Sequence, residues 1–150
     1  MLRHCVASII SPPYWGVISL VFISVFMSDV QSVYNMLDDR ASRYGGTVAQ
    51  MLDITPPSLW DSPTELTAFW DQRDLSHVFP QSTHAWMAND WDNIIPESPS
   101  DNRARGADVM TDVELLDAQL DNELLAIDIE SMSFDDSGDF ASELIDMAFA

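Results

Sequence analysis

Apolar residues recur along much of the chain at steps of three and four, the spacing that places side chains on one face of an α-helix. The first series lies in residues 28–44 and consists of Val30, Val33, Leu37, Ala41 and Tyr44. Gly45-Gly46 follows it directly and predicts the end of the helix. A second series follows a capping box at residues 111–114 and consists of Val113, Leu116, Leu120, Leu124 and Ile127. We expect two amphipathic helices, with Asp117, Asp121 and Asp128 facing away from the apolar residues of the second.

Shorter helices are predicted from their capping residues. Thr47 is placed to cap a helix that runs to Leu52, and Ser62-Pro63 combines a capping serine with proline at the first helical position. The helix after Ser62 carries Leu66, Phe69 and Trp70, which we expect to pack against the segment that follows. Ser98-Pro99 repeats the same signal, and Gly106 is suited to end that helix. A turn over residues 133–138 and a short acidic helix over residues 139–150 complete the chain.

Two short apolar runs in the centre of the chain predict β-strands. They cover residues 75–79 and 93–95, and a polar interval joins them. Trp86 and Trp91 lie in this interval, where they could form a small core of their own. With the helix that begins at Pro99, the order is strand, strand, helix. The predicted class is therefore α+β and mostly helical, with a small ββα core flanked by amphipathic helices.

The first 27 residues are apolar and carry no charge between Cys5 and Met27. They are compatible with a signal peptide, with a membrane anchor, or with an over-extended gene start ahead of Met27. No small-residue cleavage site follows the run, and Pro12-Pro13 leaves about half of the ~20 residues that a membrane helix needs. A membrane location requires that residues 5–27 are retained. The anchor and the later start remain alternatives of equal weight.

The charge of the chain is strongly and unevenly negative. The net charge is -19, from 25 acidic residues and 6 basic ones, all of them arginine. Residues 107–150 hold 13 of the acids and no arginine, so residues 1–106 hold 12 acids and 6 arginines, a net charge of -6. This balance weighs against a simple DNA-binding module, because such a chain repels nucleic acid at long range. The single cysteine excludes an internal disulfide and a cysteine-cluster zinc site.

Three short motifs occur in order within residues 73–107. They read Ser76-His77-Val78-Phe79-Pro80-Gln81-Ser82, then Asp92-Asn93-Ile94, then Asp101-Asn102-Arg103-Ala104-Arg105-Gly106. This segment resembles the HNH endonucleases, including the small HNH proteins of tailed phages, whose core is a ββα metal site. The resemblance divides the chain into an apolar segment (1–27), a helical support (28–72), the HNH-like core (73–107) and an acidic helical tail (108–150).

The resemblance implies a role for each matched residue. His77 falls at the position of the general base, a role that suits histidine because its unperturbed pKa of about 6.5 lets it accept protons near neutrality. Asn93 falls where the family braces the hairpin, and Asn102 where the helix supplies a ligand to one Mg²⁺ or Mn²⁺ ion. Arg103 and Arg105 are the nearest candidates for binding the phosphates of DNA.

Ser76 departs from the family pattern, because the residue before the base is usually an Asp or His that binds the metal. A hydroxyl is a poorer ligand for a hard cation than a carboxylate. Asp74 lies two residues earlier on the same face of a strand and could substitute through a water molecule. The simpler interpretations are that His77 is a structural histidine and that Arg103 and Arg105 pair with Asp101, Asp108 or the acidic tail.

Two functions follow from these residues. The first is a phage-encoded HNH endonuclease that cuts DNA in the cytoplasm of an infected bacterial host. The second is an interaction protein that kept the HNH scaffold without its chemistry. It would bind a basic partner through residues 108–150, or mimic the charge of DNA. A membrane-anchored acidic protein is a third alternative, which depends on residues 5–27.

Overall fold

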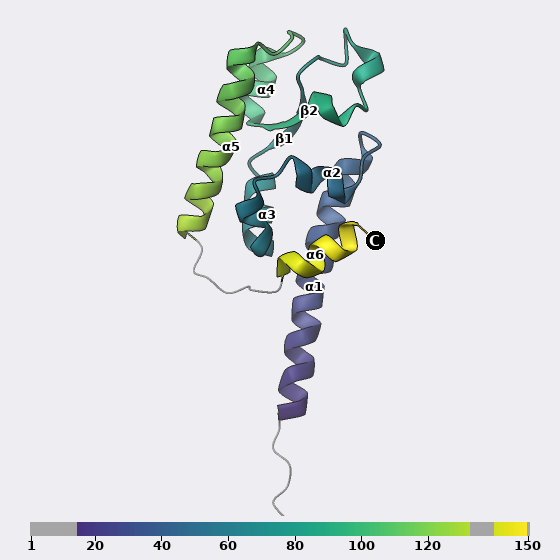
Figure 1. The fold of residues 1–150 in the computed structure, drawn as a ribbon, viewed down its shortest axis with the longest axis vertical. Coiled ribbons are helices and arrows are strands. Elements are labelled where there is room, and N and C mark those ends of the chain that lie inside the picture. Colours follow the sequence, from purple (N-terminus) through teal and green to yellow (C-terminus); the bar gives the residue numbers. More distant parts are fainter. Residues whose placement is uncertain (1–14, 133–139, 150) are drawn as a thin grey trace, which may run out of the picture.

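The computed structural model describes residues 15–132 and 140–149, which form a mostly helical α+β fold around one two-stranded sheet (Figure 1). A long helix, α1, supports the smaller elements, and α5 runs along the other side of the molecule. The elements in chain order are α1 (Trp15–Ser42), α2 (Val48–Asp53), η1 (Pro57–Asp61), α3 (Pro63–Trp70), β1 (Asp74–His77), η2 (Ala85–Met87), η3 (Trp91–Asn93), β2 (Ile94–Glu97), α4 (Pro99–Arg105), α5 (Asp112–Met132) and α6 (Phe140–Ala148).

The amphipathic face predicted for α1 is confirmed, but the helix begins earlier than the periodic pattern indicated. Val30, Val33, Leu37 and Ala41 are buried, as their spacing predicts. The helix starts at Trp15 and continues through residue 28, because no proline interrupts the chain between Pro13 and Pro56. Within residues 15–132 and 140–149, no helix combines the length and the apolar character that crossing a bilayer requires.

The helical core forms where α2, α3 and α6 pack on α1, and η1 packs on α3 and α6. The predicted caps are confirmed: the hydroxyl of Thr47 accepts from the backbone of Gln50, and the hydroxyl of Ser62 accepts from the backbone of Glu65. Phe69 and Trp70 are completely buried in this core, where Leu75 is the hairpin residue that packs against it. Helix α6 crosses α1 and buries Leu144 (Figure 1). The predicted turn at residues 133–138 lies outside the described residues.

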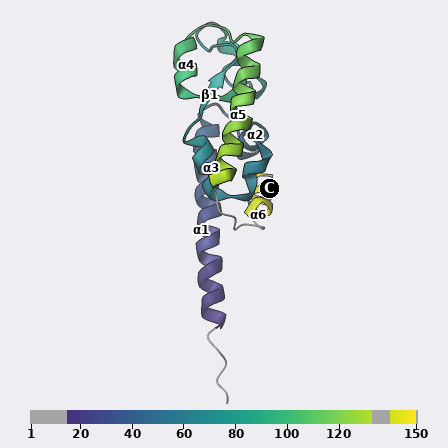
Figure 2. The ribbon, with the colours of Figure 1, turned by 90° about the vertical axis from the view of Figure 1, so that its left-hand side faces the viewer.

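β1 and β2 form an antiparallel hairpin in which Ser76 pairs with Ile95 and His77 with Ile94. Both strands are displaced by one or two residues from their predicted limits. Asn93 accounts for the early end of β1, because its side-chain amide bonds to both the backbone N–H and the C=O of Phe79. A side chain therefore replaces strand pairing at this position. Figure 2 shows α4 and α5 on either side of this hairpin, which α4 contacts through β1 and α5 through β2.

Helix α5 has the predicted capping box, but it packs through a different face from the one that the apolar spacing indicated. Its buried residues are Ala118, Asn122, Ala126 and Ile129. The two alanines are small enough to let the helix approach α3 and β2 closely. Asn122 accepts from Arg73 Nε at 2.6 Å and donates to the carbonyl of Pro96 at 2.9 Å. Burial lowers the pKa of Arg73, because removing the guanidinium from water disfavours its charged form. The hydrogen bond to Asn122 offsets this loss of hydration.

The loop between the strands has no core of its own, contrary to the expectation for its two tryptophans. Trp86 is 77% exposed and contacts only the ring of His84 among the aromatic residues described. Trp91 packs instead on the main core, with its indole against the backbone of Gly46. The Gly45-Gly46 turn after α1 therefore contacts the loop between the strands through Trp91. The contact requires glycine at residue 46, because a side chain there would occupy the place of the indole.

Replacing Gly46 by alanine should destabilise the fold by about 1–3 kcal/mol, the usual cost of overpacking. A Cβ at this position would lie 2.0 Å from the indole of Trp91, so the ring must move. Urea unfolding would measure the change. The same substitution in a Trp91→Ala background removes the clash and should cost much less; an equal cost in both backgrounds would contradict the proposed contact.

Candidate functional site

The end of β1 meets α4 at the point where the family resemblance predicts the catalytic site. Ser76 is buried, and its hydroxyl donates to Asn102 Oδ1 at 3.1 Å. Ser98 caps α4 and Pro99 begins it, so that Asn102 lies one turn into the helix, facing the strand. His77 follows Ser76 directly. Three of the predicted site residues are therefore neighbours across the hairpin and the helix.

The His77 ring is held by contacts on two sides. Its Nε2 atom lies 3.0 Å from the carbonyl oxygen of Ala88, and its ring meets Tyr44 edge-on at 5.1 Å between centroids. A carbonyl can only accept a hydrogen bond, so Nε2 carries the hydrogen. The Gln81 amide nitrogen lies 3.1 Å from the same ring atom. Because a protonated Nε2 cannot accept a hydrogen bond, the amide must turn its oxygen toward the ring when Nε2 donates to Ala88. In the neutral ring, Nδ1 is left as the basic nitrogen.

Asn93 braces the loop that carries Ala88. It is 1% exposed and uses both ends of its amide. Oδ1 accepts from the Phe79 N–H at 2.7 Å, and Nδ2 donates to the carbonyls of Phe79 and Met87 at 3.1 Å each. Met87 is next to Ala88, whose carbonyl orients the His77 ring. Asn93 therefore has the bracing geometry that the resemblance implied and does not touch the reacting groups itself.

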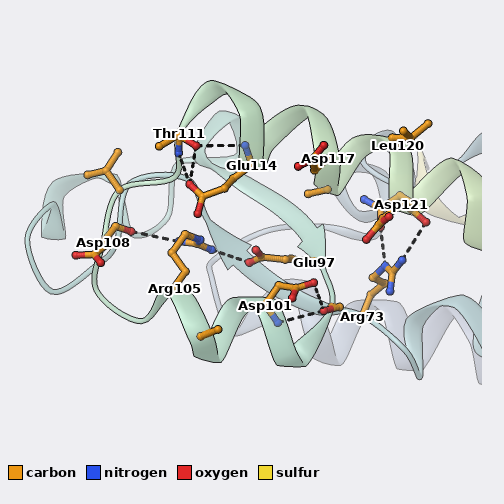
Figure 3. Close-up of a pocket in the computed structure, with 15 residues that line it drawn as sticks. Arg73, Glu97, Asp101, Arg105, Asp108, Thr111, Glu114, Asp117, Leu120 and Asp121 are labelled. Carbon is orange, nitrogen blue, oxygen red and sulfur yellow. Dashed lines mark hydrogen bonds and ion pairs between the residues drawn. The ribbon is translucent and has the colours of Figure 1, made fainter.

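Arg105 is buried in an ion pair and is not available for phosphate binding. Its Nη2 atom donates to Glu97 Oε2 and to Ser76 Oγ, both at 2.6 Å, and both ionic side chains are at least nine-tenths buried. Nη1 donates to the carbonyl of His77 at 3.1 Å. The guanidinium thus fixes β1, β2 and α4 relative to one another (Figure 3). Arg103, two residues earlier on the opposite face of α4, is exposed and remains a candidate for binding a phosphate.

A small pocket adjoins Asn102 and opens toward the end of α1. Its volume is about 190 Å³, and it is lined by Arg40, Arg43, Tyr44, Asp74, Leu75 and Asn102. Asp74 and Asn102, the two residues predicted to hold a metal ion, both line this pocket. His77 does not line it but contacts Tyr44, which does. The volume is sufficient for a phosphate group.

Sequence reasoning missed Arg40 and Arg43, which are two of only six basic residues in the chain. They lie 33 and 30 residues before the start of the HNH-like segment, in a region for which the sequence predicted only a supporting role. Arg40 donates to the carbonyl of Arg73 at 3.2 Å, which ties its helix to the start of β1. Their available signal was their scarcity, since two of the six arginines of the chain stand three residues apart on this helix. Both already have a carboxylate neighbour: Arg43 pairs with Asp39, and Arg40 lies 4.0 Å from Asp71.

The residues at this site supply one carboxylate and one amide oxygen for a metal ion. Among the described residues, no group of three or more His, Cys, Asp or Glu is placed to share a cation. Mg²⁺ needs fewer, because it commonly binds one or two carboxylates and keeps several waters. Asp74 and Asn102 fit such a donor set. Ser76 does not, since its hydroxyl already accepts from the Arg105 guanidinium, whose charge repels a cation.

Comparison of the chain with protein family models, with curated proteins and with solved structures finds no match. The function is therefore inferred from the geometry of the hairpin, α4 and the end of α1, together with the resemblance of residues 73–107 to HNH endonucleases.

Proposed function

We propose that the chain is a metal-dependent endonuclease of the HNH type that hydrolyses phosphodiester bonds in DNA. The observation that carries the proposal is the meeting of β1 with α4, where Ser76 contacts Asn102 beside an oriented histidine. We also propose that the enzyme is phage-encoded and acts in the cytoplasm of an infected bacterial host.

His77 acts as the general base. Since Nε2 donates to Ala88, the Nδ1 lone pair can take a proton from the water that attacks the phosphorus atom. The Ala88 carbonyl also stabilises the imidazolium that forms, because its oxygen attracts the positive ring. Asn93 acts as a positioning residue, since its bonds to Phe79 and Met87 hold the loop on which Ala88 lies.

Asp74 and Asn102 are the residues that would hold a single Mg²⁺ or Mn²⁺ ion. When bound, the ion would stabilise the negative charge that builds on the phosphate and the leaving oxygen. Arg40 and Arg43 line the same pocket and would bind a phosphate oxygen in exchange for their present carboxylate neighbours, Asp71 and Asp39. Arg103 is exposed on α4 and could contact a neighbouring phosphate of the same strand.

The pocket at Asp74 lies apart from the large acidic groove along α5, but its own lining and surroundings include the carboxylates of Asp74, Asp39 and Asp71. The large acidic groove along α5 and the pocket at Asp74 share no lining residue. Arg40 and Arg43 lie near the C-terminal end of α1 and next to β1, where Arg43 pairs with Asp39 and Arg40 lies 4.0 Å from Asp71. A phosphate that enters the pocket would therefore compete with these two carboxylates for the guanidinium groups.

Plasmid nicking by the full chain tests the proposal. With Mg²⁺ or Mn²⁺ we expect supercoiled DNA to become open-circular, and His77→Ala to reduce the rate by at least about 100-fold, the usual contribution of a general base. Asp74→Asn and Asn102→Ala should raise the metal concentration required. His84→Ala is the matched control, because His84 lies in the same loop without contact to Asn102, and it should nick at the normal rate.

Absence of nicking by the unmodified chain, or equal nicking by His77→Ala, would show that this site does not hydrolyse DNA. Circular dichroism of each variant distinguishes lost chemistry from lost structure. The interaction protein then becomes the better supported function, and a specific observation already favours it: the apolar face of α5 is exposed.

A further inference from the structure

Helix α5 presents a continuous row of large apolar side chains to solvent. Val113, Leu116, Leu120, Leu124 and Ile127 are each between 51% and 66% exposed. We refer to these five residues as the α5 stripe. The opposite face is the one that packs on the protein, through Ala118, Asn122, Ala126 and Ile129. Aligned apolar side chains of this size are rare on a monomer surface and mark a site of interaction.

Rows of carboxylates border the α5 stripe on both sides. At about 100° per residue, Asp117, Asp121 and Asp128 fall on one side of the stripe, and Asp112 and Glu123 on the other. No lysine or arginine occurs anywhere after Arg105. The surface is thus an apolar strip between two negative margins, about 21 Å long from Val113 to Ile127 at 1.5 Å per residue.

An acidic groove extends one of these margins (Figure 3). It lies between α4 and α5, has a volume of about 750 Å³, and reaches the α5 stripe at Leu120. The acids that line it are Glu97, Asp101, Asp108, Glu114, Asp117 and Asp121. Its two arginines are already bonded, Arg105 to Glu97 and Arg73 to Asn122 and the Asp121 carbonyl. The groove therefore offers carboxylates to cationic side chains that extend beyond the stripe.

The charge of these margins decides between possible occupants. A second copy of the chain would bring α5 against α5 and place carboxylates opposite carboxylates, which is unfavourable. An anionic lipid surface would be repelled for the same reason. A helix with leucine-like residues at three- and four-residue steps and Lys or Arg beside them satisfies both the apolar strip and its margins.

We propose that α5 binds an amphipathic basic helix of a partner protein. Apolar side chains of that helix pack on Leu116, Leu120 and Leu124, and its cations extend to Asp117 and Asp121 and into the acidic groove. The proposal does not depend on the nuclease activity, because none of these residues belongs to the pocket of Asp74 and Asn102.

The test uses a fluorescein-labelled 18-residue peptide made of leucine at helical spacing and lysine elsewhere. We expect the full chain to bind it in fluorescence anisotropy, with an affinity that falls as salt is raised. Leu120→Ser with Leu124→Ser should weaken binding at least tenfold, and Asp117→Asn with Asp128→Asn several-fold. Both pairs are exposed, so the fold is preserved. Trp86→Ser, an equally exposed aromatic away from α5, is the matched control and should bind normally.

Three results would overturn the proposal. The first is normal binding by the Leu120→Ser, Leu124→Ser variant, which would place the peptide elsewhere. The second is equal binding of a scrambled peptide of the same composition, which would show charge attraction without recognition of a helix. The third is a dimer in sedimentation that the leucine substitutions dissociate, which would identify a second copy as the occupant. His77→Ala should bind the peptide normally, so this test is independent of the nicking assay.

Discussion

Replacing Arg105 by leucine should destabilise the protein by about 3–5 kcal/mol, the usual cost of removing one partner of a buried ion pair. Glu97 would remain buried beside an apolar side chain, with its charge uncompensated. Ser76 would lose the 2.6 Å bond from the same guanidinium, and the His77 carbonyl would lose its donor. One substitution thus removes the contacts that fix both strands to α4.

Urea unfolding at neutral pH measures this effect. Arg103→Leu is the matched control, because Arg103 lies on the same helix but is exposed, and it should change stability by less than about 0.5 kcal/mol. Adding Glu97→Leu to Arg105→Leu should recover much of the loss, since a buried pair replaced by apolar residues is often nearly neutral. Equal stability of the Arg105→Leu and Arg103→Leu proteins would contradict the buried pair.

Asn93→Ala should have the second largest effect, a loss of about 2–4 kcal/mol from three hydrogen bonds at roughly 1 kcal/mol each. The substitution leaves the Phe79 N–H and C=O and the Met87 C=O without their side-chain partner. The loop over residues 78–93 should then loosen, and with it the Ala88 carbonyl that orients His77. We therefore expect nicking to fall even at temperatures where the protein remains folded.

Unfolding of Asn93→Ala, combined with amide hydrogen exchange over residues 78–93, measures both consequences. Asn89→Ala, an exposed asparagine in the same loop, is the control and should have little effect. Asn93→Asp keeps the acceptor for the Phe79 N–H but turns a carboxylate toward two carbonyls, so it should be nearly as harmful. If Asn93→Asp had the same free energy of unfolding as the unmodified protein, the Asn93 amide would not brace the loop.

The local part of this fold could be predicted from the sequence because its signals are local. Thr47, Ser62 and Ser98 each cap a helix at the place predicted from their residue type. Proline follows Ser62 and Ser98 at the first helical position. The strand–strand–helix order of the central segment is likewise confirmed. Strand limits were less predictable, since Asn93 replaces backbone pairing with side-chain bonds.

The orientation of α5 could not be predicted from apolar periodicity. Which face of the helix is buried depends on contacts with α3 and β2, which are distant in the sequence. Ala118 and Ala126 are weak apolar signals beside the five leucines of α5, yet their small size sets the packing. Asn122 would be read as a polar surface residue, although it joins Arg73 to the Pro96 carbonyl. The strongest apolar face of the helix is for that reason the exposed one.

The candidate site was predicted in the same uneven way. Asp74, Ser76 and Asn102 come together as their spacing within one ββα segment implied. Arg40 and Arg43 reach the site only through the packing of α1 on the hairpin, which no local pattern indicates. Arg105 was predicted to bind phosphate from its place in a motif, but its burial against Glu97 gives it a structural role.

The central claim is that Asp74 and Asn102 together hold one catalytic cation, and a Mn²⁺ titration followed by amide NMR tests it most directly. At low ratios of metal to protein, paramagnetic broadening should appear first at residues 74–77 and at Asn102. Asp74→Asn should abolish it there. Broadening that begins at the carboxylates of α5, with the signals of Asp74 and Asn102 unaffected, would contradict the claim.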